Sequence, residues 1–467
     1  MPVSARAQAT AEAATSASEV PVPKPNLVFV FADQWRADAL GYTGNPDVQT
    51  PNLDKLAADS LNFTHAVSGC PVCSPYRGSL LTGQHWLTHG VFLNDVHLRD
   101  DAVSFAEALK AGGYDTGYIG KWHLDGRGRL NYIPRESRQG FDFWRVMECT
   151  HNYNESYYYA DEPEMLLWQG YDAFAQTREA QRYIEQHGQD KPFALFLSLG
   201  PPHAPYGTAP ELYRAMYEPS ALTLRANVPE ELEDTARDEI AGYYAHCTAL
   251  DTCMGYLRNT LKSAGLEDNT VFVFTSDHGD MLRSQGEIKK QRPWDESIRV
   301  PFLLRYPARL GAEGRKLDTL LNTPDLMPTL LGLCGVDIPA TVEGQDYSGA
   351  LLAGETPETD CAFIMCPAPF GQWTRKMGGR EFRGVRTKRY TYTRDLNGPW
   401  LLYDNEADPM QLNNLVNDPA HEAVQTELEG LLQRKLAETK DDFLPADAYI
   451  AQWGYTVDKD GTVPYTN

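Results

Sequence analysis

The stretch Asn26-Leu-Val-Phe-Val-Phe-Ala-Asp33 decides the fold, because it is a continuous apolar run that ends on a carboxylate. The same pattern returns at Pro192-Phe-Ala-Leu-Phe-Leu-Ser-Leu199, which precedes Pro201-Pro-His203, and at Thr270-Val-Phe-Val-Phe-Thr-Ser-Asp277-His278. Continuous apolar runs of this length are typical of parallel strands that are buried on both faces of a sheet. We therefore predict three parallel strands, each with polar side chains at its carboxyl end.

Amphipathic helical stretches lie between these runs, for example at residues 104–111 and 171–186. The alternation of strands and helices predicts an α/β fold with a central, mostly parallel sheet and helices on both of its faces. Ligands of such sheets bind beyond the carboxyl ends of the strands. The polar groups that end the three runs are therefore the first candidates for a functional site.

The sequence changes after about Pro357 to shorter, cationic and aromatic segments. Phe382-Arg-Gly-Val-Arg-Thr-Lys-Arg-Tyr-Thr-Tyr-Thr393 and Trp400-Leu-Leu-Tyr403 flank Asn397-Gly398, which is a hairpin signal. A closing helix is expected at residues 419–439. We predict a disordered leader at residues 1–24, a large domain at residues 25–355 that carries the candidate site, and a smaller subdomain with an antiparallel sheet at residues 356–467.

The charge of the chain argues against a nucleic-acid partner. The 467 residues include 42 Lys and Arg against 64 Asp and Glu, a formal net charge of −22, and no block rich in Lys and Arg. The release of counterions that drives nucleic-acid binding is therefore missing. An anionic substrate would need a local cluster of positive charge.

The N-terminal segment gives no sign of export or membrane insertion. No stretch approaches the roughly 18 consecutive apolar residues that a membrane span needs, so we expect a soluble chain. Charged and polar residues interrupt the leader, so the apolar core of a signal peptide does not form. Localisation stays open: periplasmic or secreted if a signal was removed, and cytoplasmic otherwise.

Eight cysteines are too few and too irregularly spaced for a disulfide framework, and we expect most of them to be buried thiols. Cys70 and Cys73 form a single Cys-x-x-Cys. A redox pair or half of a zinc site has the same spacing, but the chain has no second Cys-x-x-Cys to complete a four-cysteine zinc site.

Cys73-Ser-Pro75-Tyr-Arg77-Gly-Ser79-Leu-Leu-Thr-Gly83 places a thiol close to the start of a helical pattern, where the helix dipole lowers a thiol pKa. The spacing Cys-x-Pro-x-Arg followed by Leu-Thr-Gly resembles the signature of the type I, formylglycine-dependent sulfatases of the alkaline phosphatase superfamily. In that family a maturing enzyme oxidises the cysteine to formylglycine. The resemblance thus implies formylglycine at position 73, a formylglycine-generating enzyme as a partner, and an alkaline-phosphatase-like α/β fold.

Two acidic motifs at strand ends extend the resemblance. Asp33-Gln34 is similar to the family's first metal-binding pair, in which many members have two aspartates, so Gln34 is a departure. Asp277-His278-Gly279 resembles the second half of the metal site. The resemblance implies one divalent metal bound by Asp33, Gln34, the modified Cys73, Asp277 and His278. Oxygen ligands favour Ca²⁺, with Mg²⁺ or Mn²⁺ as alternatives.

Three further segments match the family's basic residues. Lys121 and His123 match its Lys-x-His, and His203 matches its active-site histidine loop. Lys290 lies where the family has a lysine before residues 295–301, and the adjacent Lys289 is the neighbour that sequence alone can confuse with it. The other histidines match no catalytic position: His65, His85, His89, His97, His151, His187, His246 and His421.

The resemblance also implies a mechanism. One hydroxyl of hydrated formylglycine attacks sulfur, and the other later expels sulfate as the aldehyde re-forms. Arg77, Lys121 and Lys290 neutralise the sulfate together with the metal. Asp33 or Asp277 activates the nucleophile, His203 with Lys290 protonates the leaving oxygen, and His123 assists the elimination.

We expect the substrate to be a sulfated carbohydrate rather than a small aryl ester. Residues 127–168 are a candidate cleft wall, and their aromatic side chains either stack on sugar rings or belong to the core. The late cations Arg375, Lys376, Arg380 and Arg383 either hold an anionic sugar or are structural. Two alternative functions remain: a phosphodiester or phosphonate monoester hydrolase of the same superfamily, and a non-catalytic binder of sulfated glycans in which Cys73 stays a thiol.

Overall fold

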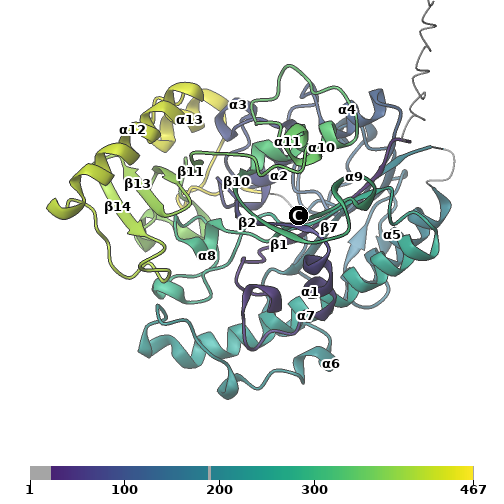
Figure 1. Ribbon diagram of the computed structural model, residues 1–467, viewed down its shortest axis with the longest axis horizontal. Coiled ribbons are helices and arrows are strands. Elements are labelled where there is room, and N and C mark those ends of the chain that lie inside the picture. Colours follow the sequence, from purple (N-terminus) through teal and green to yellow (C-terminus); the bar gives the residue numbers. More distant parts are fainter. Residues whose placement is uncertain (1–22, 188–190, 466–467) are drawn as a thin grey trace, which may run out of the picture.

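The centre of the protein is an eight-stranded sheet in the order β10-β2-β9-β8-β1-β7-β3-β4 (Figure 1). The computed structural model describes residues 23–187 and 191–465, so the predicted leader lies outside the described residues except for its last two. The strands of this sheet are β1 (Asn26–Asp33), β2 (Leu61–Val67), β3 (Asp115–Lys121), β4 (Phe143–Met147), β7 (Phe193–Pro202), β8 (Thr270–Ser276), β9 (Phe302–Arg305) and β10 (Arg315–Asn322).

The three apolar runs form the middle of the sheet, as predicted. β1 pairs in parallel with β7 on one side and with β8 on the other, so that Val28 lies opposite both Leu195 and Phe272. All eight residues of β1 are buried. β9 is antiparallel to β2 and β8, which makes the sheet mixed but mostly parallel. The predicted α/β fold is confirmed.

Helices cover both faces of the sheet (Figure 1). Alternate residues of β1 point to opposite faces: Val28, Val30 and Ala32 pack with α1, α5 and α7, whereas Leu27, Phe29 and Phe31 belong to the core that α2, α4, α10, α12 and α13 share. The helices are α1 (Pro51–Ala58), α2 (Cys73–Thr82), α3 (Trp86–His89), α4 (Phe105–Ala111), α5 (Asp172–Gln186), α6 (Glu211–Arg214), α7 (Glu233–Ser263), α8 (Asp295–Ile298), α9 (Pro307–Leu310), α10 (Leu326–Leu333), α11 (Ser348–Leu352), α12 (Glu422–Glu438) and α13 (Ala446–Trp453).

Local sequence signals set several of these boundaries. Helix α4 begins after Ser104, whose hydroxyl accepts from the Glu107 backbone N–H while the Glu107 carboxylate accepts from the Ser104 N–H, a reciprocal capping box. Helix α2 ends at Gly83, which adopts the left-handed conformation that glycine tolerates best. The predicted closing helix is confirmed as α12, preceded by a short 3₁₀ turn at Pro419–His421.

Strand β3 reaches the first residue of the Lys-x-His motif. β3 continues to Lys121 because Gly120 pairs with Ser198 of β7 and Lys121 pairs with Met147 of β4. Lys121 is therefore fixed by the sheet itself, rather than placed in the loop beyond it.

The C-terminal part forms a four-stranded antiparallel sheet, β11-β12-β13-β14. Its strands are β11 (Ala362–Cys366), β12 (Phe382–Arg386), β13 (Tyr390–Asp395) and β14 (Gly398–Asp404). The predicted hairpin across Asn397-Gly398 is confirmed as β13 and β14. The segment 382–393 contains two strands, β12 and β13, which are separated by residues 387–389 and pair with each other.

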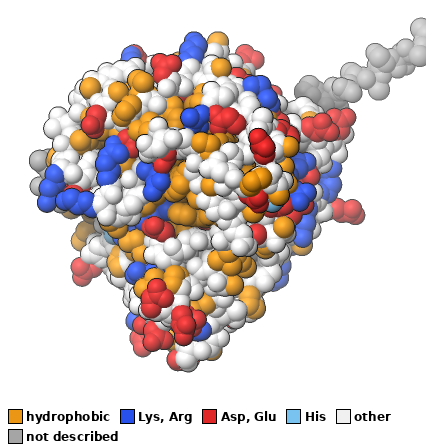
Figure 2. Space-filling model, turned by 90° about the vertical axis from the view of Figure 1, so that its left-hand side faces the viewer, with side chains coloured by type: hydrophobic (Ala, Val, Ile, Leu, Met, Phe, Trp, Pro, Cys, Tyr) orange, Lys and Arg blue, Asp and Glu red, His pale blue; other side chains and the backbone are white. Residues whose placement is uncertain are grey.

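One face of the protein carries mixed charge. On the face that Figure 2 shows, Lys and Arg side chains are interspersed with Asp and Glu, with hydrophobic side chains between them. Within residues 23–187 and 191–465, no helix combines the length and the hydrophobicity that a membrane crossing requires.

Candidate active site

The carboxyl ends of neighbouring strands bring the candidate residues together. β1 ends on Asp33, β3 ends on Lys121, β7 runs into His203, and β8 runs into Asp277 and His278. These four strands are consecutive in the sheet, in the order β8-β1-β7-β3, so segments up to about half the chain length apart meet at one edge. This is the edge at which α/β proteins bind ligands.

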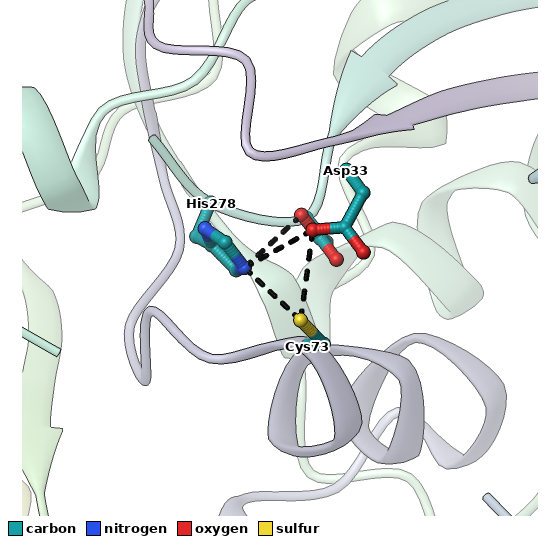
Figure 3. A group of neighbouring side chains, drawn as sticks. Asp33, Cys73 and His278 are labelled. Carbon is teal, nitrogen blue, oxygen red and sulfur yellow. Dashed lines mark hydrogen bonds and ion pairs between the residues drawn. The ribbon is translucent and has the colours of Figure 1, made fainter. Parts of the chain in front are cut away.

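Cys73 lies at the centre of this cluster, at the first residue of α2 (Figure 3). Its Sγ lies 3.5 Å from Asp33 Oδ1, 3.4 Å from His278 Nε2 and 2.8 Å from Lys290 Nζ. The side chain is 1% exposed. Burial and the Asp33 charge oppose ionisation of the thiol, but Lys121, Lys290 and His278 hold the pKa of Cys73 well below its usual value.

Two buried carboxylates face each other beside Cys73. The ligand atoms of Asp33, Cys73, Asp277 and His278 all lie within 4.8 Å of one another. Although burial disfavours its charge, Lys121 holds the pKa of Asp33 well below its usual value, whereas burial and the Asp33 charge raise the pKa of Asp277. A cation between the two carboxylates would relieve their repulsion.

Gln34 supplies a further oxygen that suits a metal ion. Its backbone N–H donates to Asp277 Oδ1 at 2.9 Å, and its Nε2 donates to Asp280 Oδ2 at 2.7 Å. Its Oε1 is buried and has no hydrogen-bond partner among the described residues. Asp280 thus fixes the amide so that the carbonyl oxygen stays free, which fits a hard cation that prefers oxygen ligands.

His278 is oriented as a metal ligand as well. Its Nδ1 lies 2.9 Å from the carbonyl oxygen of Gly279, so this nitrogen carries the proton and donates. The other nitrogen, Nε2, points at Cys73 and Asp33 (Figure 3). It also lies 3.4 Å from Asp277 Oδ1. A backbone contact of this kind fixes the tautomer that binds metal. The predicted set of donors therefore fits one divalent cation.

Three cationic side chains converge on the same cluster. Arg77 NH2 lies 3.2 Å from Asp277 Oδ2, and its NH1 donates to Ser198 Oγ at 2.7 Å. Lys121 Nζ lies 2.5 Å from Asp33 Oδ2, and Lys290 donates to Cys73. All three are at most 3% exposed. Such a density of buried positive charge suits an anionic ligand.

The structure distinguishes Lys290 from its neighbour. Lys290 contacts Cys73, whereas Lys289 is half-buried and adopts a left-handed backbone conformation with φ of 58°. Burial and the charge of Lys290 lower the pKa of Lys289. The geometry thus agrees with the placement of Lys290, rather than Lys289, among the candidate site residues.

His123 is held by a carboxylate that the sequence did not reveal. Its Nε2 lies 3.2 Å from Asp95 Oδ1, and its Nδ1 is buried without a hydrogen-bond partner among the described residues. Burial disfavours a charged ring, but the neighbouring Cys149 sulfur and the Asp95 carboxylate raise the pKa of His123 to about 9. Asp95 also accepts two hydrogen bonds from Arg129.

His203 follows β7 and is 4% exposed. Its Nδ1 lies 2.8 Å from the Ala204 carbonyl oxygen, so Nδ1 donates and Nε2 is the free nitrogen. Burial, Lys290 and His151 hold the pKa of His203 well below its usual value. His151, which matched no catalytic position in the sequence, stacks on this ring at a centroid distance of 4.3 Å.

Three of the four late cations pair with carboxylates, whereas Lys376 is exposed. Arg383 is 0% exposed and pairs with Asp441, Arg375 pairs with Glu381, and Arg380 pairs with Asp395. The aromatic side chains at Trp144 and Tyr153 are 0% exposed and belong to the core, as one of the two interpretations expected.

The cysteines follow the expectation of buried thiols. All eight lie among the described residues, and all are free and buried. Cys70 is not part of the group of donors around Cys73. Burial and the neighbouring Cys366 raise the pKa of Cys70 well above its usual value. The Cys-x-x-Cys spacing therefore holds neither a disulfide nor half of a zinc site in this structure.

The fold and this cluster define a class: an α/β enzyme with a buried cysteine, the donors for one divalent cation, and an excess of cationic side chains for an anionic substrate. A sulfatase family profile matches residues 25–336, and a profile for the C-terminal part of N-sulphoglucosamine sulphohydrolase matches residues 285–438. The chain belongs to the sulfatase family of the alkaline phosphatase superfamily. The resemblance inferred from the motifs is confirmed.

Individual relatives agree with this assignment. An ulvan-active sulfatase of Formosa agariphila is 46% identical over 448 residues, which cover 95% of this chain and 87% of that protein. A solved structure from the glycosaminoglycan metabolism of Bacteroides thetaiotaomicron superimposes with a TM-score of 0.82 at 29% identity, covering 92% of this chain and 99% of that one. A phosphonate monoester hydrolase of Agrobacterium radiobacter, at 24% identity and a TM-score of 0.74 over 90% of this chain and 97% of that one, shares the fold.

Proposed function

We propose that this sulfatase hydrolyses sulfate esters of a carbohydrate, with formylglycine formed from Cys73 as the nucleophile. One observation carries the proposal: Cys73 lies within 3.5 Å of Asp33, His278 and Lys290, at the point where the metal donors and the cations converge. The carbohydrate part is supported by the relative named as an ulvan-active sulfatase.

Two groups complete the proposed site. Asp33, Gln34, Asp277, His278 and the oxygen at position 73 would hold one divalent metal, for which we propose Ca²⁺, because four of the five ligands offer oxygen. Bound there, the metal supplies positive charge beside the sulfate. Hydrated formylglycine supplies one hydroxyl for attack on sulfur and a second for release of sulfate. A formylglycine-generating enzyme is the implied partner.

The cations bind the sulfate group. Arg77, Lys121 and Lys290 are buried, and their positions are fixed by contacts with Ser198, Asp33 and Cys73. Donors held in place in this way stabilise the charge that develops on the sulfate oxygens without having to reorganise during the reaction. Asp33 has the carboxylate oxygen that lies 3.5 Å from Cys73 Sγ, which favours it for activation of the nucleophile.

The two histidines differ in charge and therefore in proposed role. His203 has a free Nε2 and a low pKa, and a bound sulfate ester adds negative charge beside it, which favours protonation. We assign His203 Nε2, with Lys290, to protonation of the leaving oxygen. His123 is charged at neutral pH and has a free Nδ1–H, which suits a hydrogen bond to a sulfate oxygen and assistance in the elimination.

The proposal is tested by release of inorganic sulfate from oligosaccharides prepared from ulvan, with 4-nitrophenyl sulfate and bis-4-nitrophenyl phosphate as companion substrates. Preference for the sulfate esters is the expected result. Preference for the phosphodiester would favour the superfamily alternative, a phosphodiester or phosphonate monoester hydrolase. Binding of ulvan oligosaccharides without turnover, in a sample that keeps an unmodified Cys73 thiol, would favour a non-catalytic binder.

A further inference from the structure

The segment from Glu148 to Tyr153 connects the two candidate catalytic histidines. It follows β4, and its start is paired with the end of β3 through hydrogen bonds from Trp122 N to Met147 O at 2.9 Å and from His123 N to Glu148 O at 2.8 Å. Its other end is tied to the His203 loop, because the buried Tyr153 hydroxyl donates to the His203 carbonyl oxygen at 2.9 Å. The segment is thus fixed at both ends inside the active site.

This attachment places His151 flat against His203. The two rings have a centroid distance of 4.3 Å and an interplanar angle of 14°. His151 is half-buried, whereas His203 is 4% exposed, so His151 covers one face of the His203 ring. The two histidines belong to separate loops, and the contact between them is made by their side chains.

The His203 ring needs such a contact to keep its direction. The one hydrogen bond that the ring makes to the described residues runs from Nδ1 to the carbonyl oxygen of Ala204. This bond selects the tautomer, but its acceptor is the next residue of the same loop. Rotation of a histidine ring about its Cβ–Cγ bond is broad and weakly restrained. A flat neighbour on one face restricts this rotation, and with it the direction of Nε2.

We propose that His151 is a positioning residue for sulfate ester cleavage, which stacks on His203 and aims His203 Nε2 at the oxygen of the leaving group. This inference rests on the proposed function. The family motifs assign no role to His151. The charged and titratable groups around His203 are Lys290, His151, Asp33 and Lys121, and Cys149 lies beside His151.

The leaving group provides a test that a purely structural role would not pass. A leaving group that is a weak acid depends on protonation, whereas 4-nitrophenolate leaves with little help. The experiment measures kcat/KM on phenyl sulfate and on 4-nitrophenyl sulfate for the wild type and for the His151→Ala and His151→Phe variants. The ratio of the two values is independent of the fraction of active enzyme, so a partly unfolded variant still gives a result.

We expect His151→Ala to lower kcat/KM on phenyl sulfate by about 10-fold or more and on 4-nitrophenyl sulfate by less than about 3-fold, since general acid catalysis contributes about 10² or more in full. His151→Phe keeps a flat ring and should restore most of the loss. The pH dependence of kcat on phenyl sulfate should also shift in His151→Ala, because the surroundings of His203 change.

A matched control is available at His187, which is half-buried and stacks on Tyr183 at 4.0 Å away from the active site. His187→Ala should leave the ratio unchanged. Equal losses on both substrates in His151→Ala, no loss on either, or a phenylalanine variant no better than alanine would each overturn the inference. A wild type that hydrolyses neither sulfate ester would instead contradict the proposed function.

Discussion

Replacement of Lys290 by alanine tests the electrostatic part of the site most sharply. Its Nζ lies 2.8 Å from Cys73 Sγ, and the residue is 3% exposed. A pair of unit charges at this distance interacts by at most about 6 kcal/mol at an effective dielectric constant of about 20. Removal of one fixed donor from an enzyme site commonly costs about 10²–10³-fold in kcat. We expect Lys290→Ala to lower kcat/KM by about 10²-fold or more, with a nearly unchanged melting temperature.

The adjacent Lys289 is the control for this substitution. Lys289→Ala removes the same side chain from the next residue, and we expect less than about a 3-fold effect, since surface and half-buried lysines outside a site contribute little. Both variants are assayed by release of sulfate from 4-nitrophenyl sulfate, with thermal unfolding measured in parallel. A large loss of kcat/KM in Lys289→Ala together with an unchanged value in Lys290→Ala would show that Lys289, rather than Lys290, is the active-site lysine. Full activity in both would place the site elsewhere.

Three further substitutions test the metal, the His123 pair and a buried acid. Chelation should abolish turnover, and Asp277→Ala should lose bound metal by elemental analysis, because a hard-cation site depends on its charged ligands; full activity in a metal-free sample would contradict this. Asp95→Asn removes a carboxylate that helps to raise the pKa of His123 to about 9, so the alkaline limb of the pH–activity profile should move to lower pH, and an unmoved limb would refute the role of the pair. Burial raises the pKa of Asp172 to about 8, so its neutral form is favoured in the folded state. Its contribution to the free energy of unfolding is full below about pH 4 and is lost towards pH 8, at no more than about 1.4 kcal/mol per pH unit. Asp172→Asn should flatten that dependence in chemical denaturation, and an equal slope in both proteins would show that Asp172 is ionised.

The sequence predicted the centre of the fold because short continuous runs of apolar residues indicate buried strands. The run from Asn26 to Asp33 is apolar at all positions between its two ends, and these positions alternate between the two buried faces of the sheet. A single stretch therefore identified a central parallel strand. The same logic placed Asp33, His203 and Asp277 at one edge, since the carboxyl ends of parallel strands meet there. The sequence did not reveal the turn between β12 and β13, because cationic and aromatic residues continue across it.

The missed site residues depend on contacts that leave no local pattern. Asp95 reaches His123 across 28 residues, and Asp280 reaches Gln34 across 246. The sequence assigned His151 no catalytic position, because its stacking partner, His203, lies on a separate loop. The acidic residue Asp280 explains the departure at Gln34, since a second carboxylate at position 34 would face Asp280 without a donor between them.

Arg383 shows that the sequence also cannot identify which cationic side chains are held in internal ion pairs. Arg383 looked available for an anionic sugar, but its guanidinium pairs with Asp441 in the interior of the C-terminal part. A pairing partner 58 residues away cannot be read from composition or spacing. The domain boundary between residues 355 and 356 stays a prediction.

The mass of the peptide that contains Cys73 is the most direct test of the central claim. In protein purified from a host with a maturing enzyme, oxidation of the thiol to the aldehyde lowers the peptide mass by about 18 Da. The proposed function predicts that the fraction of modified peptide rises in proportion to sulfate ester hydrolysis across preparations, and that Cys73→Ala is inactive. Full activity in a preparation that contains only the unmodified thiol would contradict the account.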